Sequence, residues 1–253
     1  MKKRLDVILF ERGFFESREK AKREIMVGNV TVCEHLVTKA GTMYKDDENL
    51  NIRIKDKLKY VSRGGLKLEG AIKAFDIDFE DKVVLDIGSS TGGFTDCALQ
   101  HKAIFVYSVD VGTNQLAYSL RNNEKVKSIE NTHINKLDVN LLNMGLADIV
   151  VADLSFISLT KVIPDIRRYI KKGAYLVLLI KPQFEVGADY IGKNGIVKEE
   201  KYREFAINKV KDSLIENNYE LINIINSPIK GTKGNIEYLA YIKDVQNYEE
   251  FEN

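Results

Sequence analysis

The segment Val83–Asp96 (VVLDIGSSTGGFTD) constrains the fold of this chain more than any other stretch. Its apolar start, Val83–Leu85, predicts a buried strand that ends at Asp86. A loop with three glycines follows, and Phe94 opens a predicted helix. The glycines are Gly88, Gly92 and Gly93. A strand, a glycine-rich loop and a helix in this order let a ligand approach the backbone at the carboxyl edge of an open α/β sheet.

The glycine loop has two interpretations, a ligand site and a tight turn that needs glycine for positive φ. A ligand is favoured because Asp86, an acid at the end of an apolar strand, faces the position that a ligand would occupy. The spacing differs from the G-x-G-x-x-G of dinucleotide enzymes, since Ser90 stands in place of the second glycine. We therefore expect a nucleoside ligand without phosphates.

The D-x-G-x-x-x-G-G pattern of this loop resembles the S-adenosylmethionine loop of class I methyltransferases. The resemblance implies that S-adenosylmethionine contacts a run of residues in and around the loop. These residues are Asp86, Gly88, Ser89, Ser90, Gly92, Gly93 and Phe94. About 20 residues past the loop, Asp110 follows a second predicted strand, Ile104–Val109, and is placed to accept hydrogen bonds from ribose hydroxyls.

Length and composition limit what the chain can be. Its 253 residues can hold one α/β domain and a small extra domain, and 44% hydrophobic residues suffice for a core. No apolar run approaches the roughly 20 residues that span a bilayer, and charges interrupt the apolar part of the first 20 residues. Two separate cysteines and three scattered histidines indicate neither a disulfide framework nor a metal site. We expect a cytoplasmic protein without a membrane segment or a metal.

The net charge of +1 hides a basic amino-terminal part. Residues 1–23 contain eight Lys or Arg against four Asp or Glu, and residues 55–73 contain six against two. A basic region on a neutral protein indicates a polyanionic partner, and a solvated helix face is the alternative.

The first 59 residues predict a compact α+β module. Apolar residues at helical spacing predict helices over Arg4–Arg12 and Arg18–Met26, and short strands are predicted at Val30–Val32 and Leu50–Ile54. The second helix carries its basic residues on the side away from the predicted core.

RLDVILFERGFFESREKAKREIMVGNVTV resembles the small RNA-binding domain first recognised in a ribosomal small-subunit protein. The resemblance implies that basic residues of a helix and the following turn contact folded RNA. The matching residues are Arg4, Arg18, Lys20, Lys22 and Arg23, and we add Arg63 beyond the connector. RNA helices are recognised mainly through phosphates and 2′-hydroxyls, which suits clustered Arg and Lys. A generic pair of helices is the alternative.

Residues 60–253 alternate between predicted strands and helices. After the first two strands we expect strands at Val126–Glu130, Asp148–Ala152, Ala174–Ile180, Tyr219–Ile225 and Ile236–Ile242. Helices are expected over residues 62–75, Gln115–Leu120, Ser158–Lys171 and Lys201–Glu216. This order predicts an α/β fold with a class I, Rossmann-like methyltransferase sheet.

Four polar residues lie where such a sheet places its sites. Asp153 and Lys181 directly follow apolar strands, Glu237 lies within the last predicted strand, and Lys67 lies early on a predicted helix. Alone, each has an ordinary interpretation, such as a solvated lysine or a helix-capping aspartate. Together, beside a methyl-donor loop, they indicate a catalytic set.

Motifs that this chain lacks indicate which kind of atom accepts the methyl group. Amino-methylating enzymes usually carry an Asp/Asn-Pro-Pro-aromatic element after the fourth strand, whereas this chain has ADLSF. Carbon-5 pyrimidine methylation needs a thiolate, and neither Cys33 nor Cys97 lies in a suitable place. A hydroxyl acceptor needs only proton removal and in-line placement, which a lysine provides when its surroundings lower its pKa.

Six motifs in order, from RLDVIL through SRGGLKLEGA, LDIGSSTGGFTD, VVADLSFISL, LIKPQFE and GNIEYL, resemble the TlyA (haemolysin A-like) family over almost the whole chain. These are FtsJ-like ribosomal RNA 2′-O-methyltransferases. The resemblance implies methylation of cytidine 2′-hydroxyls in ribosomal RNA or ribosomal subunits, with Asp153 also near the cofactor. It implies a catalytic tetrad of Lys67, Asp153, Lys181 and Glu237.

Two other classes of function stay open at this point. One is a non-catalytic ribosome assembly factor that binds RNA and keeps S-adenosylmethionine as a structural ligand, which the intact tetrad disfavours. The other is a membrane-active toxin, which would need an amphipathic or apolar segment that the sequence lacks.

Overall fold

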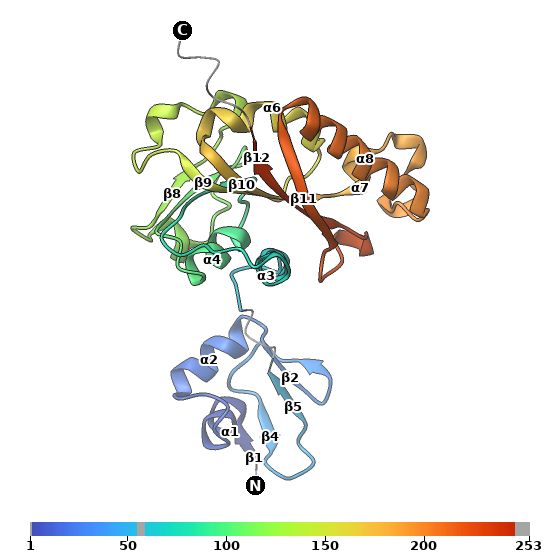
Figure 1. Cartoon of the computed structure of the whole chain (residues 1–253). Coiled ribbons are helices and arrows are strands. Elements are labelled where there is room, and N and C mark those ends of the chain that lie inside the picture. Colours follow the sequence, from blue (N-terminus) through green and yellow to red (C-terminus); the bar gives the residue numbers. More distant parts are fainter. Residues whose placement is uncertain (1, 55–58, 246–253) are drawn as a thin grey trace. The chain divides into compact units, whose positions relative to one another are not determined.

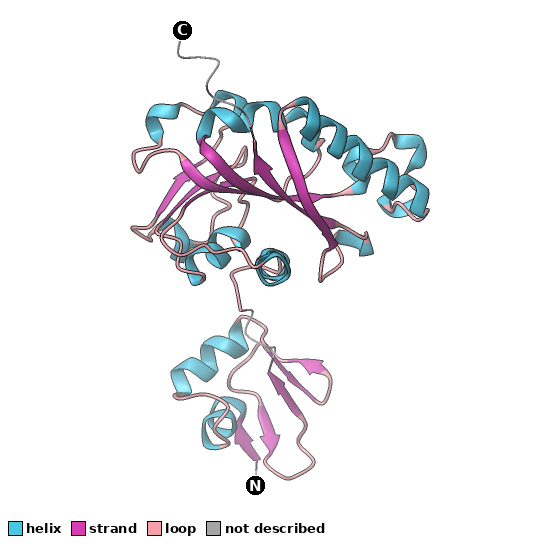
Figure 2. Ribbon diagram, viewed as in Figure 1, coloured by secondary structure: helices cyan, strands magenta, loops and turns pink. Residues whose placement is uncertain are grey.

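A computed structural model describes residues 2–54 and 59–245. The chain divides into two compact units, Met1–Lys57 and Leu58–Asn253 (Figures 1 and 2). Within the described residues, no helix combines the length and the apolar character needed to cross a membrane.

The amino-terminal unit is a small α+β module. Its elements are β1 (Lys2–Arg4), α1 (Leu5–Glu11), α2 (Arg18–Met26), β2 (Val30–Val32), β3 (His35–Leu36), β4 (Met43–Lys45) and β5 (Ile52–Ile54). The side chain of Ser17 caps α2 by accepting a hydrogen bond from the Lys20 amide over 3.2 Å. Both helices bury apolar residues against β2, among them Leu5, Leu9 and Ile25. The short pair β1–β4 was not expected from the sequence, because three exposed or half-buried residues carry no strand pattern.

The carboxy-terminal unit is built on a seven-stranded sheet with the order β11-β12-β10-β9-β6-β7-β8. Its strands are β6 (Val83–Ile87), β7 (Phe105–Val109), β8 (Val126–Ile129), β9 (Ala147–Ala152), β10 (Ile170–Ile180), β11 (Tyr219–Asn226) and β12 (Tyr238–Asp244). Five strands, β10 to β8, are parallel, whereas β12 runs antiparallel to both of its neighbours. The predicted class I methyltransferase sheet is therefore confirmed.

Helices cover both faces of this sheet, as Figures 1 and 2 show. The helices are α3 (Gly64–Phe75), α4 (Gly93–Gln100), α5 (Tyr118–Arg121), α6 (Ile163–Ile166), α7 (Pro182–Glu185) and α8 (Glu200–Glu216). Short 3₁₀ turns are η1 (Ile134–Lys136), η2 (Val139–Leu141), η3 (Leu159–Lys161), η4 (Arg167–Tyr169), η5 (Ala188–Tyr190), η6 (Lys193–Gly195) and η7 (Thr232–Gly234). Alternate residues of a strand enter different cores: Val84 packs with α3 and α4, whereas Leu85 packs with α6 and α8.

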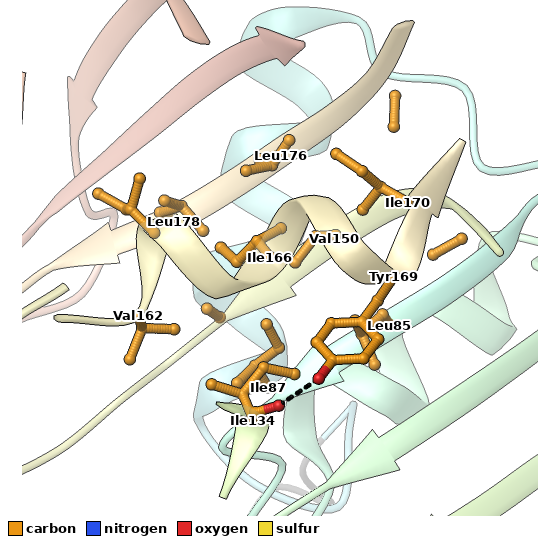
Figure 3. Close-up of a cluster of buried hydrophobic side chains, with 14 of the residues drawn as sticks. Leu85, Ile87, Ile134, Val150, Val162, Ile166, Tyr169, Ile170, Leu176 and Leu178 are labelled. Carbon is orange, nitrogen blue, oxygen red and sulfur yellow. Dashed lines mark hydrogen bonds between the residues drawn. The ribbon is translucent and has the colours of Figure 1, made fainter. Parts of the chain in front are cut away.

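Figure 3 shows part of the core on the α6 side of the sheet. Side chains from the strands, among them Leu85, Val150 and Leu178, pack beneath Ile166 of α6. The Tyr169 hydroxyl is buried there and donates to the Ile134 carbonyl over 2.7 Å, so the ring fills the core without an unpaired polar atom. These contacts make the sheet a rigid support for the loops at its carboxyl edge.

Three details of the predicted secondary structure are wrong. The helix expected over Ser158–Lys171 is broken into η3, α6 and η4, because Pro164 lacks an amide and its ring obstructs the carbonyl four residues earlier. The helix expected at Gln115–Leu120 is only the single turn α5. Glu237 lies just before β12 rather than within it, and its carbonyl accepts from the Ser227 amide over 2.8 Å.

Candidate active site

The glycine loop between β6 and α4 adopts left-handed backbone at three positions, with φ of +79° at Gly88, +48° at Ser90 and +94° at Gly92. A Cβ at Gly88 would lie 2.8 Å from the Leu154 side chain, and one at Gly92 would lie 2.4 Å from Leu120. Both positions therefore need glycine for conformation and for space.

Asp86 lies beneath the loop rather than facing a ligand. The strand β6 continues to Ile87, so the Asp86 side chain is fully buried, and it lines neither cavity described below. Thr95 of α4 donates to its Oδ2 over 2.6 Å, and the Thr95 hydroxyl also lies 2.7 Å from that of Ser108. Burial raises the pKa of Asp86 to about 7, against the opposing effect of the Thr95 hydrogen bond. Asp86 thus joins the two elements that flank the loop.

A first cavity of about 530 Å³, the Asp110 cavity, opens where β6, β7 and β9 end. The Asp110 carboxylate accepts from the Ser90 amide through Oδ2 (2.8 Å) and from the Gly112 amide through Oδ1 (2.7 Å). Around this acid the wall is mainly apolar. It includes Ile87, Val109, Val111, Ile134, Leu154, Phe156, Ile157 and Val162.

The Asp110 cavity suits an adenosine-like ligand. Each Asp110 carboxylate oxygen accepts one hydrogen bond from a backbone amide and keeps a lone pair for a ribose hydroxyl. The apolar wall suits a flat base. Of the predicted cofactor residues, Gly88, Ser90, Asp110 and Asp153 line it. Sequence reasoning missed residues 132–134 and 154–157; the available signal was that they directly follow β8 and β9.

A second cavity of about 600 Å³, the Lys67 cavity, shares Ser90 and Asp153 with the first. Four basic residues line it, Arg63, Lys67, Lys230 and Lys233. Ser89, Gly93 and Phe94, which were predicted to contact a cofactor, line this second cavity, whereas Gly92 lines neither. The two cavities meet at the end of β9, so their ligands would lie side by side there.

The structure brings all four predicted catalytic residues together at this junction. Lys181 Nζ lies 2.6 Å from Asp153 Oδ1, and Lys67 Nζ lies 3.5 Å from Asp153 Oδ2. Lys67 also donates to Glu237 Oε2 over 2.7 Å. The result is a chain of alternating charges from four separate elements: the end of β10, the end of β9, the first half of α3 and the residue before β12.

The cluster is desolvated and held by its surroundings. The Glu237 side chain is 2% exposed and those of Lys67 and Lys181 are 10% exposed, whereas Asp153 is more open at 21%. A Cβ at Gly231 would lie 1.9 Å from Glu237 Oε1, so the loop before β12 packs directly on this carboxylate. Lys181 also donates to Ser155 Oγ over 2.8 Å. Each charge therefore has an opposite charge beside it, as burial requires.

Phe156 is an aromatic residue of the site that sequence reasoning missed. It follows β9, has a φ of +64°, and is 92% exposed while lining the Asp110 cavity. Its ring centroid lies 5.2 Å from that of Phe184. An exposed aromatic ring at a cavity mouth is suited to stacking on a flat ligand.

The basic residues predicted for RNA differ in their surroundings. Arg4 and Arg18 both bind the fully buried Asp6, with Arg4 Nε 2.9 Å from Oδ1 and Arg18 Nη2 3.0 Å from Oδ2. Lys20 and Lys22 make ion pairs with exposed glutamates of α2 or just before it, and Arg23 is exposed. Arg63 belongs to the other unit, where it lines the Lys67 cavity and its Nη2 donates to the Lys230 carbonyl over 3.4 Å.

Within residues 2–54 and 59–245, no three His, Cys, Asp or Glu side chains are grouped so that they could hold a metal ion.

Comparison with known proteins places both units in families. The FtsJ-like methyltransferase model matches residues 60–243, and the S4 domain model matches residues 3–50. The chain is 44% identical over 238 residues to hemolysin A of Brachyspira hyodysenteriae, covering 94% of this chain and 98% of that protein. It is 37% identical over 240 residues to the 16S/23S rRNA (cytidine-2′-O)-methyltransferase TlyA of Mycobacterium tuberculosis, covering 95% and 89%.

A solved structure from Streptococcus thermophilus, described as a hemolysin, superposes with a TM-score of 0.74 at 40% identity, covering 97% of this chain and 90% of that one. Similarity of this extent includes residues of both units. The chain therefore belongs to the FtsJ-like methyltransferase family, carries an amino-terminal S4 domain, and is related over most of its length to TlyA and hemolysin A.

Proposed function

We propose that this methyltransferase transfers the methyl group of S-adenosylmethionine to the 2′-hydroxyl of a cytidine in ribosomal RNA. The observation that carries the proposal is the Lys67–Asp153–Lys181–Glu237 cluster at the junction of two cavities. The relatives named as rRNA (cytidine-2′-O)-methyltransferases support the choice of acceptor.

The Asp110 cavity is the proposed donor site. Asp110 would hold the ribose hydroxyls, the glycine loop would approach the amino-acid part, and residues such as Leu154 and Ile157 would enclose the base. When bound, S-adenosylmethionine supplies an electrophilic methyl group on a sulfonium sulfur. The amide hydrogen bonds to Asp110 fix the direction of its carboxylate before a ligand arrives, which lowers the entropy lost on binding.

The Lys67 cavity is the proposed acceptor site. Its basic residues suit the phosphates of an RNA strand, and Lys230 and Lys233 extend this charge onto the loop before β12. A nucleotide in this cavity would bring its ribose to Asp153, the residue that both cavities share.

Lys181 is the proposed proton acceptor for the ribose hydroxyl. Its Nζ is held by Asp153 and Ser155, so the amine has a fixed place at the junction where donor and acceptor meet. A ribose hydroxyl is a very weak acid, so an aligned base assists as the methyl group moves in line. Lys67 and Glu237 would orient Asp153 and the acceptor ribose.

The two units would divide recognition and chemistry. We propose that residues 1–59 form an RNA-binding domain and that residues 60–253 form the catalytic domain, in accordance with the extents of the two family matches. The exposed Arg23 and the half-buried Lys20 and Lys22 of α2 offer the charge that RNA binding needs.

The test is to map ribose methylation in ribosomal RNA after incubation of unmodified ribosomal subunits, or free RNA, with the protein and S-adenosylmethionine. We expect a new 2′-O-methylcytidine with the native protein and its formation to be slowed by about 2–4 orders of magnitude with Lys181→Ala. Donor binding without methylation on either substrate would overturn the proposal and favour a non-catalytic assembly factor.

A further inference from the structure

Two segments at the cavity junction are joined at several points along their length. One is the loop after β9, residues 153–159, and the other is the turn after β10, residues 181–185. Lys181 binds Asp153 and Ser155 at one end, and the Phe184 ring contacts Phe156 in the middle. The far end of the turn is joined to the loop by Glu185.

Glu185 binds the loop with both carboxylate oxygens. The Ser158 hydroxyl donates to Oε2 over 2.5 Å, and the Leu159 amide donates to Oε1 over 2.8 Å. Glu185 is 3% exposed, and Lys209 of α8 donates to its backbone carbonyl over 2.7 Å, so the turn itself is anchored. These contacts involve none of the four proposed catalytic residues.

We propose that Glu185 is a positioning residue, which holds the loop after β9 so that Ser155, Asp153 and Phe156 keep their places around Lys181. The proposal rests on the proposed function, because it concerns the same junction. It assigns to the last residue of the LIKPQFE motif a role that acts through the loop and does not require contact with either ligand.

The loop needs such a restraint for two reasons. Phe156 has a left-handed φ of +64°, a conformation that a non-glycine residue adopts only when its surroundings compensate. Residues 153–157 line the Asp110 cavity, and Phe156 is 92% exposed there. The Glu185 carboxylate accepts hydrogen bonds from both the Ser158 hydroxyl and the Leu159 amide, and these bonds fix the position of the last residues of the loop.

The chemistry of Glu185 also favours a specific role over filling space. Burial raises the pKa of Glu185, while the hydrogen bonds from Ser158 and Leu159 oppose that rise. An apolar residue would occupy the same volume without this desolvation, but it would leave the buried Leu159 amide unpaired and would leave the Ser158 hydroxyl only its contacts with Thr160.

The test compares Glu185→Ala with Glu185→Gln in kcat, in S-adenosylmethionine affinity and in loop mobility. Because the chain contains no tryptophan, Phe156→Trp gives a single tryptophan on the loop, the loop reporter, which is excited selectively over the tyrosines and used only to measure anisotropy. Tyr118→Trp on α5, which is 82% exposed and lines neither cavity, gives the α5 reporter as a reference. Glu69→Ala is the matched control, since Glu69 is a buried glutamate paired with Lys59 and Lys73 and lines neither cavity.

We expect Glu185→Ala to lower kcat at least tenfold and to lower the anisotropy of the loop reporter but not that of the α5 reporter. Glu185→Gln should stay within about threefold of the native kcat, because an amide can accept from Leu159 and donate to the Ser158 oxygen. Glu69→Ala should retain the native kcat below its unfolding temperature.

A folded Glu185→Ala protein with native kcat and an unchanged anisotropy of the loop reporter would overturn the proposal. If that variant does not fold, Ser158→Ala decides in its place; it removes one of the two contacts to Glu185 and also the cap that the Ser158 hydroxyl gives to the Thr160 amide. A smaller loss in kcat and in anisotropy supports the proposal, and no change in either rejects it. Loss of methylation by the native protein would instead reject the proposed function, while the anisotropy arm still tests whether Glu185 restrains the loop.

Discussion

Asp153 is the residue on which both cavities and both lysines converge. One of its oxygens faces Lys181 at 2.6 Å and the other faces Lys67 at 3.5 Å, so a single carboxylate sets the places of two amines. Because Asp153 is the most exposed member of the cluster, a bound acceptor can reach it and the adjacent Lys181. In its proposed role as a base, Lys181 cannot be replaced by a cation that stays protonated, since only a group that gives up its proton acts as a base.

For Lys181→Ala we expect methyl transfer to slow by about 2–4 orders of magnitude, the usual contribution of a general base, with S-adenosylmethionine affinity largely kept. Lys181→Arg should recover little of the rate, because a guanidinium stays protonated. Lys171→Ala is the matched control. Lys171 Nζ lies 2.7 Å from Asp148 Oδ1 near the amino-terminal ends of β10 and β9, so its replacement should leave single-turnover rates unchanged. Near-native turnover by the arginine variant would mean that position 181 supplies only charge.

The raised pKa of Asp86 predicts that the stability of the folded chain depends on pH. Burial raises its pKa from an ordinary 3.8 to about 7, so between these values the folded chain keeps a proton that the unfolded chain has released. Stability from this group is therefore full below pH 4 and is lost as the pH rises to 7. Asp86→Asn removes the ionisation but still accepts from Thr95, so its free energy of unfolding relative to the native protein should rise from pH 4 to pH 8, by at most about 4 kcal/mol.

Denaturant unfolding of the ligand-free proteins at pH 4, 6 and 8 measures this difference. Asp212→Asn, at an exposed position on α8, is the control and should follow the native curve. If the free energy of unfolding of the native protein minus that of Asp86→Asn does not change between pH 4 and pH 8, Asp86 has its ordinary pKa in the folded chain.

In the glycine loop between β6 and α4, a left-handed backbone and the lack of space for a side chain are separate reasons for glycine. Gly88 and Gly145 share a left-handed φ, +79° and +87°, but a Cβ at Gly88 meets Leu154 and the Asp153 carbonyl, whereas one at Gly145 meets nothing within 4 Å. Comparison of the two alanine variants thus isolates the effect of crowding at the junction of β6 and β9.

For Gly88→Ala we expect S-adenosylmethionine affinity to fall at least tenfold in calorimetry. The loop must move away from Leu154, which lines the Asp110 cavity, the proposed donor site. Gly145→Ala carries only the conformational cost of about 1 kcal/mol in stability and should bind the donor normally. Equal affinities in the two variants would place the donor elsewhere.

Most of the fold was predictable because the buried parallel strands are continuous apolar runs and the glycine loop marks the first of them. The errors were local: Pro164 breaks a helix whose apolar spacing is otherwise regular, and β12 begins at Tyr238, one residue after Glu237. Asp153 and Lys181 were predictable because strand ends converge at one edge of the sheet, whereas the full set with Lys67 and Glu237 rested on the family resemblance. Phe156, Lys230 and Lys233 were not, because their place depends on how loops fold back over the cavities.

The whole molecule separates its basic residues into two groups with different tasks. Arg63, Lys230 and Lys233 surround the Lys67 cavity of the catalytic unit, whereas Lys20, Lys22 and Arg23 lie on α2 of the amino-terminal unit. Arg4 and Arg18 also support the fold: burial would raise the pKa of Asp6, but their hydrogen bonds outweigh it and lower that pKa. Since removal of Arg18 would weaken the support of Asp6 as well as the RNA contact proposed for it, Arg18 is a poor probe of RNA binding alone.

Lys20→Ala with Arg23→Ala is the sharper probe, because neither residue binds the buried Asp6 and both lie on α2. We expect weaker binding to ribosomal RNA and a salt dependence of log Kd that is shallower by about one for each lost phosphate contact. S-adenosylmethionine affinity should not change, since the donor cavity is built from the other unit. Lys201→Ala with Lys211→Ala on α8 removes the same charge from the catalytic unit and should leave the slope unaltered. If both double variants lower the slope equally, general attraction to RNA accounts for the effect, and α2 is not the docking surface.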